Sequence, residues 1–541
     1  MNRLAGLDGM AFDAVVIGGG MAGAGVARDL ALRGASVALF EKGDFSSGTT
    51  SKSSKLIHGG LRYLELGDFK LVRESLREKK TLERLAPHLV RPLPFLVPIY
   101  RGSTRGLIRV RIGMWLYDLL TPGKSMERSR VIRPVNTLAL EPSIRADGLR
   151  GAGYYVDDLL LFPERMCLEN ALSAARHGAR VHNYCQVEEM VRGGRGVEAV
   201  RVRDLLSGQV HTVRGSTIIN CAGPWVDRVR EMGGVAEGAP RILRTTKGIH
   251  CLLPRMTDRA IYLSGEDERM IFVVPWREFT LVGTTDTDFQ GDPDRLWATR
   301  DEVTYLLATV ARALPDPRVA FDLVVYTYAG VRPLSWEEGV PESKVSREHR
   351  VVMEGPEGRF LSVTGTKLTC FRSLAEEVGD LVMARLGRSQ PSRSAALTLD
   401  GSDEEAATLE ARVSMDVSEE MAASGLSRET LEVLVETYGR GYGRVIELAR
   451  KLPDGTERLC PRNPEIVAQL HQAVREEMAV SLQDVLLRRT GIGQSLCQGL
   501  DCAEAVGSRM AELCGWSPRR LDAELSAYRQ HVERSHRFRT Q

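Results

Sequence analysis

Long hydrophobic runs are absent from this 541-residue sequence, and so is a strong net charge of either sign. No stretch of about 18 apolar residues occurs, so we expect no membrane-spanning helix. The formal net charge of +2 gives no reason to expect a nucleic acid partner. Residues 1–12 lack the basic start and apolar run of a signal peptide, and we therefore expect a cytoplasmic protein.

Paired cysteines are also missing. The nine cysteines are scattered and none forms a CxxC pair, so the sequence predicts neither a metal site nor a disulfide framework. Hydrophobic residues make up 43% of the chain and charged residues 27%, which is ordinary for a globular protein. The length allows two or three domains.

The amino-terminal region has the pattern of a βαβ unit. An apolar run at 13–17 ends at three glycines, a helical stretch follows at 21–33, and a second apolar run covers 35–41. This order of strand, glycine turn, helix and strand is typical of a parallel sheet that binds a dinucleotide.

The glycines of this turn satisfy the pattern G-x-G-x-x-G with Gly18, Gly20 and Gly23. They allow a tight turn, close approach of the backbone to a pyrophosphate, and close packing of the helix on the strand. Glu41 ends the second strand, where a carboxylate accepts hydrogen bonds from ribose hydroxyls and disfavours the 2′-phosphate of NADP. The spacing alone leaves NAD and FAD both open.

Later segments predict a second sheet and a separate helical region. Residues 270–276 and 279–283 read as two strands of a hairpin, and 360–364 reads as a strand that runs into a glycine turn and a helix. Residues 387–406 are polar and contain proline and glycine, which indicates a linker, and 407–541 is mostly helical in pattern.

Residues 46–65 read SSGTTSKSSKLIHGGLRYLE, a run of small hydroxyl residues followed by Lys55, His58, Arg62 and Tyr63. Hydroxyl donors, cations and an imidazole suit an anionic ligand beside a flavin. A solvated loop with an incidental histidine is the alternative.

This segment resembles the respiratory, quinone-linked FAD-dependent glycerol-3-phosphate dehydrogenases, and the resemblance extends over most of the chain. Its motifs are GGGMAGAG at 18–25, SSKLIHGGLRYLE at 53–65, APHLV at 86–90, RIGMWLYD at 111–118, YVDD at 155–158, NCAGPWV at 220–226, KGIH at 247–250, FVVPW at 272–276, VGTTDTDFQGDP at 282–293, YAGVRPL at 328–334 and GTKLTCFR at 365–372. Ala22 departs from the family, which often has Asn or Thr before the third glycine.

The resemblance implies an α/β (α+β) flavoprotein of the two-dinucleotide-binding, D-amino-acid-oxidase-like kind. Its FAD-dependent region would cover 12–386, with a Rossmann-type FAD domain interleaved with an antiparallel substrate sheet, and a helical domain at 407–541. The FAD-binding segments would be about 12–95, 150–235 and 345–386. The substrate segments would be about 96–149 and 236–344.

The resemblance also implies a reaction, the oxidation of sn-glycerol 3-phosphate to dihydroxyacetone phosphate by hydride transfer to non-covalent FAD. His58 and His250 are the candidate bases, and the sequence does not choose between them. Arg62 and Tyr63 are expected to bind the phosphate, with Arg332, Lys367 and His250 also in the substrate site. Arg332 and Lys367 are also expected to be catalytic, by stabilising charge that develops in the reaction. For Arg62 and Arg332, a surface salt bridge is the alternative.

The same resemblance implies the residues that contact FAD. These are Gly18, Gly20, Met21, Ala22, Gly23, Glu41, Lys42, Thr50, Ser51, Ser53, Ser54, Lys55, Leu56, His58, Gly60, Val187, Ala222, Gly223, Trp225, Gly283, Thr284, Gly365, Lys367, Leu368 and Thr369. The amides that follow Gly365 are expected to open a helix toward the flavin ring.

The implied electron acceptor is a membrane quinone, with the protein held at the inner face of the cell membrane. In 101–120, Ile108, Ile112, Trp115, Leu116 and Leu119 form one helical stripe, with arginines at its start. Such a helix can lie in the headgroup region, but the stripe would serve equally well to pack on the protein's own core. Open alternatives are a glycerol-3-phosphate oxidase that uses O2, another amine- or hydroxy-acid-oxidising flavoprotein, and a flavin-binding module without activity. A homodimer is also possible on this sequence.

Overall fold

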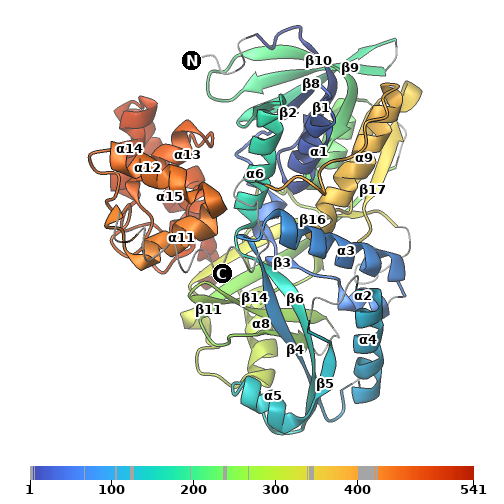
Figure 1. The fold of residues 1–541 in the computed structure, drawn as a ribbon, viewed down its shortest axis with the longest axis vertical. Helices are drawn as coiled ribbons and strands as arrows, with labels where there is room; N and C mark the ends of the chain where they lie inside the picture. The colour runs from blue at the N-terminus through green and yellow to red at the C-terminus, as the bar shows by residue number, and fades with distance from the viewer. Residues whose placement is uncertain are drawn as a thin grey trace.

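The computed structural model describes residues 4, 6–65, 67–103, 106–121, 127–194, 196–234, 240–265, 267, 269–337, 339, 347–399, 421 and 424–540, except for the side chains of Arg62, Glu65 and Pro356. Within these ranges the chain forms two sheets, each with its own helices, and a lobe of carboxy-terminal helices beside them (Figure 1).

The first sheet has eight strands around a parallel centre, in the order β17-β18-β10-β1-β2-β7, with the antiparallel hairpin β8–β9 paired to β10. Its strands are β1 (Ala11–Ile17), β2 (Val37–Phe40), β7 (Arg180–His182), β8 (Cys185–Gly193), β9 (Gly196–Asp204), β10 (Val210–Asn220), β17 (Arg350–Glu354) and β18 (Phe360–Thr364). The predicted strands at 13–17, 35–41 and 360–364 all lie in this sheet.

Helices cover one face of this sheet, and both faces of its central strand are buried. Ala14 and Val16 of β1 pack under the helices, whereas Val15 and Ile17 pack on the other face with the β8–β9 hairpin. This double burial explains the continuous apolar run in the sequence. The helices are α1 (Met21–Leu32), α6 (Pro163–Arg176) and α9 (Phe371–Arg385), with α7 (Val226–Met232) beside β18 and β8.

The second sheet has ten strands and is largely antiparallel, in the order β15-β11-β14-β13-β12-β4-β6-β3, with β16 paired to β11 and β5 to β6. Its strands are β3 (Leu56–Ile57), β4 (Val90–Tyr100), β5 (Arg130–Ile132), β6 (Leu149–Leu160), β11 (Leu243–Pro254), β12 (Ala260–Ser264), β13 (Met270–Trp276), β14 (Phe279–Gly283), β15 (Thr287–Asp288) and β16 (Tyr326–Ser335). Its helices are α2 (Leu61–Glu65), α3 (Phe69–Leu85), α4 (Leu107–Leu120), α5 (Pro134–Leu140) and α8 (Arg300–Ala313).

The predicted boundary near residue 150 differs from the structure. Strand β6 pairs with β4 from Val90 to Tyr100, so 149–160 belongs to the second sheet and not to the nucleotide-binding segments. A long antiparallel ladder holds both strands together, and β3 joins its end through Leu56 and Ile57. The hairpin predicted at 270–283 is present as β13 and β14.

The carboxy-terminal helices have their own apolar cores and form the lobe coloured orange to red in Figure 1. They are α11 (Arg428–Tyr438), α12 (Tyr442–Lys451), α13 (Val467–Arg475), α14 (Ala503–Cys514) and α15 (Pro518–Ser535). Within the predicted linker 387–406, the backbone at 394–398 accepts hydrogen bonds from Arg28 of α1, so this part packs on the first sheet's helices. Residues 400–406 lie outside the described ranges.

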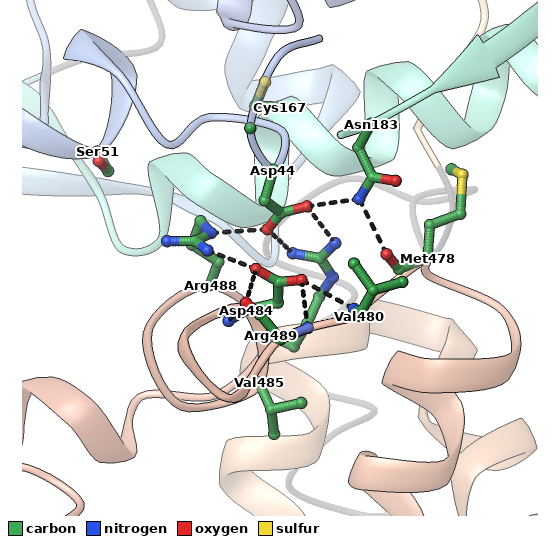
Figure 2. A network of polar contacts seen from close by, with 12 residues as sticks. Asp44, Ser51, Cys167, Asn183, Met478, Val480, Asp484, Val485, Arg488 and Arg489 are labelled. Atoms are coloured by element: carbon green, nitrogen blue, oxygen red, sulfur yellow. Dashed lines mark hydrogen bonds and ion pairs between the residues drawn. The ribbon is translucent and has the colours of Figure 1, made fainter. Parts of the chain in front are cut away.

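A buried carboxylate joins this lobe to the first sheet (Figure 2). Asp44 accepts two hydrogen bonds from Arg489, at 2.7 and 2.9 Å, and one from Arg488 at 2.6 Å. Asn183 adds a fourth at 3.0 Å. Burial alone would raise the pKa of Asp44, but attraction to Arg489 and Arg488 outweighs it and holds the pKa well below its usual value.

We predict that Asp44→Ala lowers the free energy of unfolding by about 3–5 kcal/mol, because the substitution leaves buried guanidinium charge uncompensated. Denaturant unfolding measures the change. Asp258→Ala is the control, since Asp258 forms an exposed ion pair with Arg255 that is worth about 0–1 kcal/mol. Equal effects of the two substitutions would contradict the prediction.

Candidate functional site

A cavity of about 980 Å³ is lined by residues of both sheets and of the carboxy-terminal lobe. The first sheet contributes the glycine turn after β1 and the end of β2, and the second contributes β11, β13 and β16. From the lobe, Arg488, His531 and Arg534 line it as well. The lobe is therefore part of the cavity wall.

The glycine turn has no room for side chains. A Cβ on Gly18 would lie 2.6 Å from the carbonyl oxygen of Cys221, and its φ of +104° disfavours any other residue. A Cβ on Gly23 would lie 1.9 Å from the carbonyl oxygen of Gly18. Helix α1 begins directly after Gly20, and its first residues, Met21 and Ala22, line the cavity, so the amino-terminal end of the helix lies where a pyrophosphate would bind.

Glu41 lies at the end of β2 on the cavity wall. Its carboxylate accepts hydrogen bonds from the amides of Gly19 at 2.6 Å and Gly43 at 2.8 Å. Burial raises the pKa of Glu41, and these two hydrogen bonds oppose the shift. The amides thus orient the carboxylate at the position where ribose hydroxyls are expected.

Lys42 and Trp225, two predicted cofactor contacts, both bind Asp294, a residue that was not predicted at the site. The Lys42 ammonium lies 4.0 Å from the centre of the Trp225 ring, and both side chains bond to Asp294, at 2.8 and 3.2 Å. Asp294 follows β15 of the second sheet, so this contact bridges the two sheets beside the cavity.

Most predicted cofactor contacts line the cavity, and the others lie behind its wall. Those on the cavity are Gly18, Gly20, Met21, Ala22, Glu41, Lys42, Thr50, Ser53, Ser54, His58, Gly60, Val187, Ala222, Gly223, Trp225, Thr284, Gly365, Lys367 and Leu368. Those behind it are Gly23, Ser51, Lys55, Leu56, Gly283 and Thr369. Lys52, which was not predicted, also lines the cavity.

Lys55 is the clearest correction among these residues. Its side chain is completely buried, with the ammonium 3.8 Å from Glu164 and 4.6 Å from the centre of the Trp276 ring. Burial lowers its pKa, against the attraction of Glu164. Lys55 therefore supports the hydroxyl-rich loop from behind.

His58, Tyr63 and Lys367 come together at one part of the cavity. The Lys367 ammonium donates to the carbonyl oxygen of His58 at 2.7 Å and lies 5.0 Å from the centre of the Tyr63 ring. Thr369 bonds to the backbone of His58 and holds this segment. Arg62 belongs to α2, and its side chain lies outside the described residues.

His250 occupies a more enclosed position on the same cavity. Its Nε2 lies 2.8 Å from the Ser54 hydroxyl, and its ring stacks on Tyr328 at 4.9 Å. A Cβ on Gly283 would lie 2.2 Å from the ring, so glycine there makes room for the imidazole. Burial, then Arg332 and Lys55, lower the pKa of His250 well below its usual value.

His58 is also neutral at ordinary pH. Burial, followed by the charges of Lys367 and Arg347, lowers its pKa well below its usual value. Both imidazoles line the cavity.

Arg332 of β16 is held by the turn after β14. It donates to Asp286 at 2.9 Å, to the Thr284 hydroxyl at 2.8 Å and to the carbonyl oxygen of Thr285 at 3.0 Å. Asp286 also pairs with Arg347 at 3.2 Å. Asp286 and Arg347 both line the cavity. Asp286 belongs to the turn 283–286 of the GTTDTD motif, which the sequence places on the cavity, whereas Arg347 was not predicted.

The helix expected after Gly365 begins later than predicted. A 3₁₀ turn covers Leu368–Cys370 and α9 starts at Phe371. Gly365 has a φ of +72°, and its Cβ would lie 2.5 Å from the carbonyl oxygen of Glu348. The 3₁₀ turn therefore separates the cavity from the first residue of α9.

A fold of this kind, with a glycine turn, a ribose carboxylate and a second sheet over one cavity, defines a flavin-dependent oxidoreductase. Residues 13–365 match the family model described as FAD dependent oxidoreductase, and residues 392–521 match the C-terminal domain of alpha-glycerophosphate oxidase.

Relatives of known name agree with this class. The chain is 36% identical to a glycerol-3-phosphate dehydrogenase of Synechocystis sp., over 99% of both chains. It is 33% identical to the aerobic glycerol-3-phosphate dehydrogenase of Staphylococcus aureus, over 97% of this chain and 94% of that one. The glycerol-3-phosphate dehydrogenase of Bacillus halodurans, solved with FAD, has a TM-score of 0.81 at 27% identity, covering 98% of this chain and 97% of that one. The chain belongs to the family of FAD-dependent glycerol-3-phosphate dehydrogenases.

The residues present fit FAD. Gly18 and Gly20 present backbone without side chains to the cavity, Glu41 is oriented for the ribose, and the cavity continues to Lys367 and His250. Ala22 lines the cavity and contributes no polar atom there, so the Thr50 hydroxyl, which accepts from the amide of Met21 at 3.0 Å, is a nearby polar group.

We predict that Gly283→Ala lowers kcat/KM for glycerol 3-phosphate at least about tenfold, because the added methyl group displaces the His250 ring. FAD content should be retained, since Gly283 lies behind the cavity wall. Gly443→Ala is the control, because a Cβ there meets open space. Steady-state kinetics measure the effect, and unchanged kcat/KM in Gly283→Ala would refute it.

Proposed function

We propose that the protein oxidises sn-glycerol 3-phosphate to dihydroxyacetone phosphate and passes the electrons to a quinone in the cell membrane, at its inner face. The oxidation itself follows from the family. The membrane acceptor rests on a single observation, an exposed apolar stripe on helix α4 that adjoins arginines.

The substrate phosphate is assigned to the part of the cavity that holds Tyr63 and Lys367. Lys367 supplies a point charge and Tyr63 a hydroxyl, both suited to phosphate oxygens. Arg62, next to Tyr63 in α2, is assigned to the same clamp by its position in the chain.

His58 is the proposed base. The hydride acceptor, when bound, is the flavin ring of FAD. The Nε2 of His250 is engaged by Ser54 and its Nδ1 is buried, whereas no hydrogen bond of the His58 ring is found among the described residues. His58 is therefore better placed to take the hydroxyl proton, and His250 with Arg332 orients the reacting end and stabilises charge on its oxygen.

Helix α4 exposes four large apolar side chains to solvent. Ile108 is 77% exposed, Ile112 54%, Trp115 63% and Leu119 65%. The expectation that the stripe packs on the protein's own core is therefore wrong for these four. Arg109 and Arg111 of the same helix are also exposed, as is Arg101 before it.

An anionic membrane surface fits this helix better than a protein partner does. The apolar residues can enter the boundary of the acyl chains while the arginines pair with lipid phosphates. Among the described residues, no helix is both long and apolar enough to cross the bilayer, so contact would be peripheral. Oxygen as acceptor is the second candidate, because the carboxy-terminal segment matches a domain named for an oxidase.

We predict that glycerol 3-phosphate bleaches the visible band of the bound FAD under anaerobic conditions. A soluble quinone analogue should then restore the band faster than air does. Restoration by air at the rate of substrate turnover, with hydrogen peroxide formed, would favour the oxidase. Absence of bleaching would exclude both activities and indicate a flavin-binding module.

The same titration tests the phosphate site. Lys367→Met should raise the substrate concentration for half reduction by about 100-fold, because a charged hydrogen bond to the phosphate is lost. Lys70→Met is the matched control, since Lys70 is exposed and away from the cavity. Equal titration curves for the two variants would remove Lys367 from the site.

For the membrane, we predict that Ile112→Ser with Trp115→Gln reduces sedimentation with vesicles of anionic lipid at least about tenfold, because two anchors in the acyl boundary are lost. The control is Leu205→Ser with Trp336→Gln, a pair of exposed apolar residues that lie outside α4. Flavin reduction by substrate should be unchanged in both. If the α4 variant binds vesicles as the control does, α4 is not the membrane contact.

A further inference from the structure

Cys460 meets Cys497 and Cys502, two cysteines from a later segment of the chain, in the carboxy-terminal lobe. The sulfur atoms of Cys460 and Cys497 lie 3.6 Å apart. The Cys502 thiol lies beside them and donates to the carbonyl oxygen of Gly499 at 3.5 Å. Cys460 lies between α12 and α13, and Cys497 lies in the turns before α14. No CxxC spacing marks this group, so the sequence alone did not indicate it.

An amide holds the two sulfurs of the closest pair. Asn463 is buried, and its side-chain nitrogen donates to Cys460 at 3.1 Å and to Cys497 at 3.3 Å. One amide thus holds both sulfur atoms side by side. Ser495 makes a further contact with Cys497 at 3.3 Å.

The three thiols differ in how accessible they are to an oxidant in solvent. Cys460 is fully buried, whereas Cys497 is half-buried and follows the exposed Leu496. Burial raises the pKa of Cys502, so this thiol stays protonated and unreactive. An oxidant from solvent therefore reaches Cys497 first.

We propose that Cys460 and Cys497 form a dithiol that hydrogen peroxide oxidises to a disulfide. Peroxide converts the Cys497 thiol to a sulfenic acid and one water leaves. The Cys460 thiol then attacks that sulfur, the S–S bond forms, and a second water leaves. The two sulfurs lose two electrons in total, and these reduce the peroxide.

The movement that this reaction needs is small. A disulfide brings its sulfurs to about 2.05 Å, so they must approach by roughly 1.5 Å. Residues 495–502 consist of turns, without a helix or strand that such a movement would break.

Closure at Cys497 acts on the next residue, which contacts the catalytic region. Gln498 donates to the carbonyl oxygen of Val325 at 2.6 Å, and its backbone carbonyl accepts from Tyr528 at 2.8 Å. Val325 directly precedes β16, the strand that contains Arg332. The disulfide therefore changes the rate at which substrate reduces the flavin.

The test treats the full-length FAD protein with hydrogen peroxide and then blocks free thiols. We expect the protein to lose about 2 Da before blocking, and one peptide pair to be linked through Cys460 and Cys497. Dithiothreitol should reverse both. The link should vanish in Cys497→Ser and persist in Cys514→Ser, the matched control, because Cys514 is also half-buried.

The peptide map of the wild type and the half-buried Cys497→Ser variant test the link without any substitution of the buried Cys460. Two results would contradict the proposed disulfide: addition of oxygen to the sulfur atoms with no link formed, or a link between other cysteines. For the coupling, stopped-flow flavin reduction should change at least about twofold on oxidation of the wild type and not of Cys497→Ser. An unchanged rate in the linked wild type would overturn the coupling.

Discussion

The buried contact of Asp44 with Arg488 and Arg489 is the interaction on which the cavity depends. Asp44 lies three residues after Glu41, so one loop both orients the ribose carboxylate and anchors the carboxy-terminal lobe. Arg488 also lines the cavity, so the ion pair that holds the lobe in place includes a residue of the cavity wall. A buried charge is stable only when partner groups compensate it, and the guanidinium groups of Arg488 and Arg489 compensate the Asp44 carboxylate.

The reacting end is assembled in the same way, from segments that are distant in the sequence. Lys367 bonds to the backbone of His58, and Ser54 bonds to His250. Each contact joins the hydroxyl-rich segment to a strand or turn of a different part of the chain. The burial of both imidazoles lowers their pKa well below its usual value.

Local patterns predicted the fold well where neighbouring residues decide it. The glycine turn, the strands at 13–17 and 360–364, and the hairpin at 270–283 follow from steric limits and from burial on one or both faces. The boundary at 150 could not be read in this way, because the partner of a strand is decided by a ladder with residues about 60 positions away. The exposure of the α4 stripe was equally hidden, since an apolar stripe is the same whether it faces a core or solvent.

By itself, then, the sequence determined the nucleotide turn and the family, and most of the cofactor contacts that it predicted line the cavity. Only the tertiary structure decided that Lys55 lies behind the wall, that Arg347 and Asp294 lie at the site, and that the carboxy-terminal lobe lines the cavity. The reason is physical. Backbone conformation and burial periodicity are local, whereas ion pairs and cavity walls join residues that only the folded chain brings together.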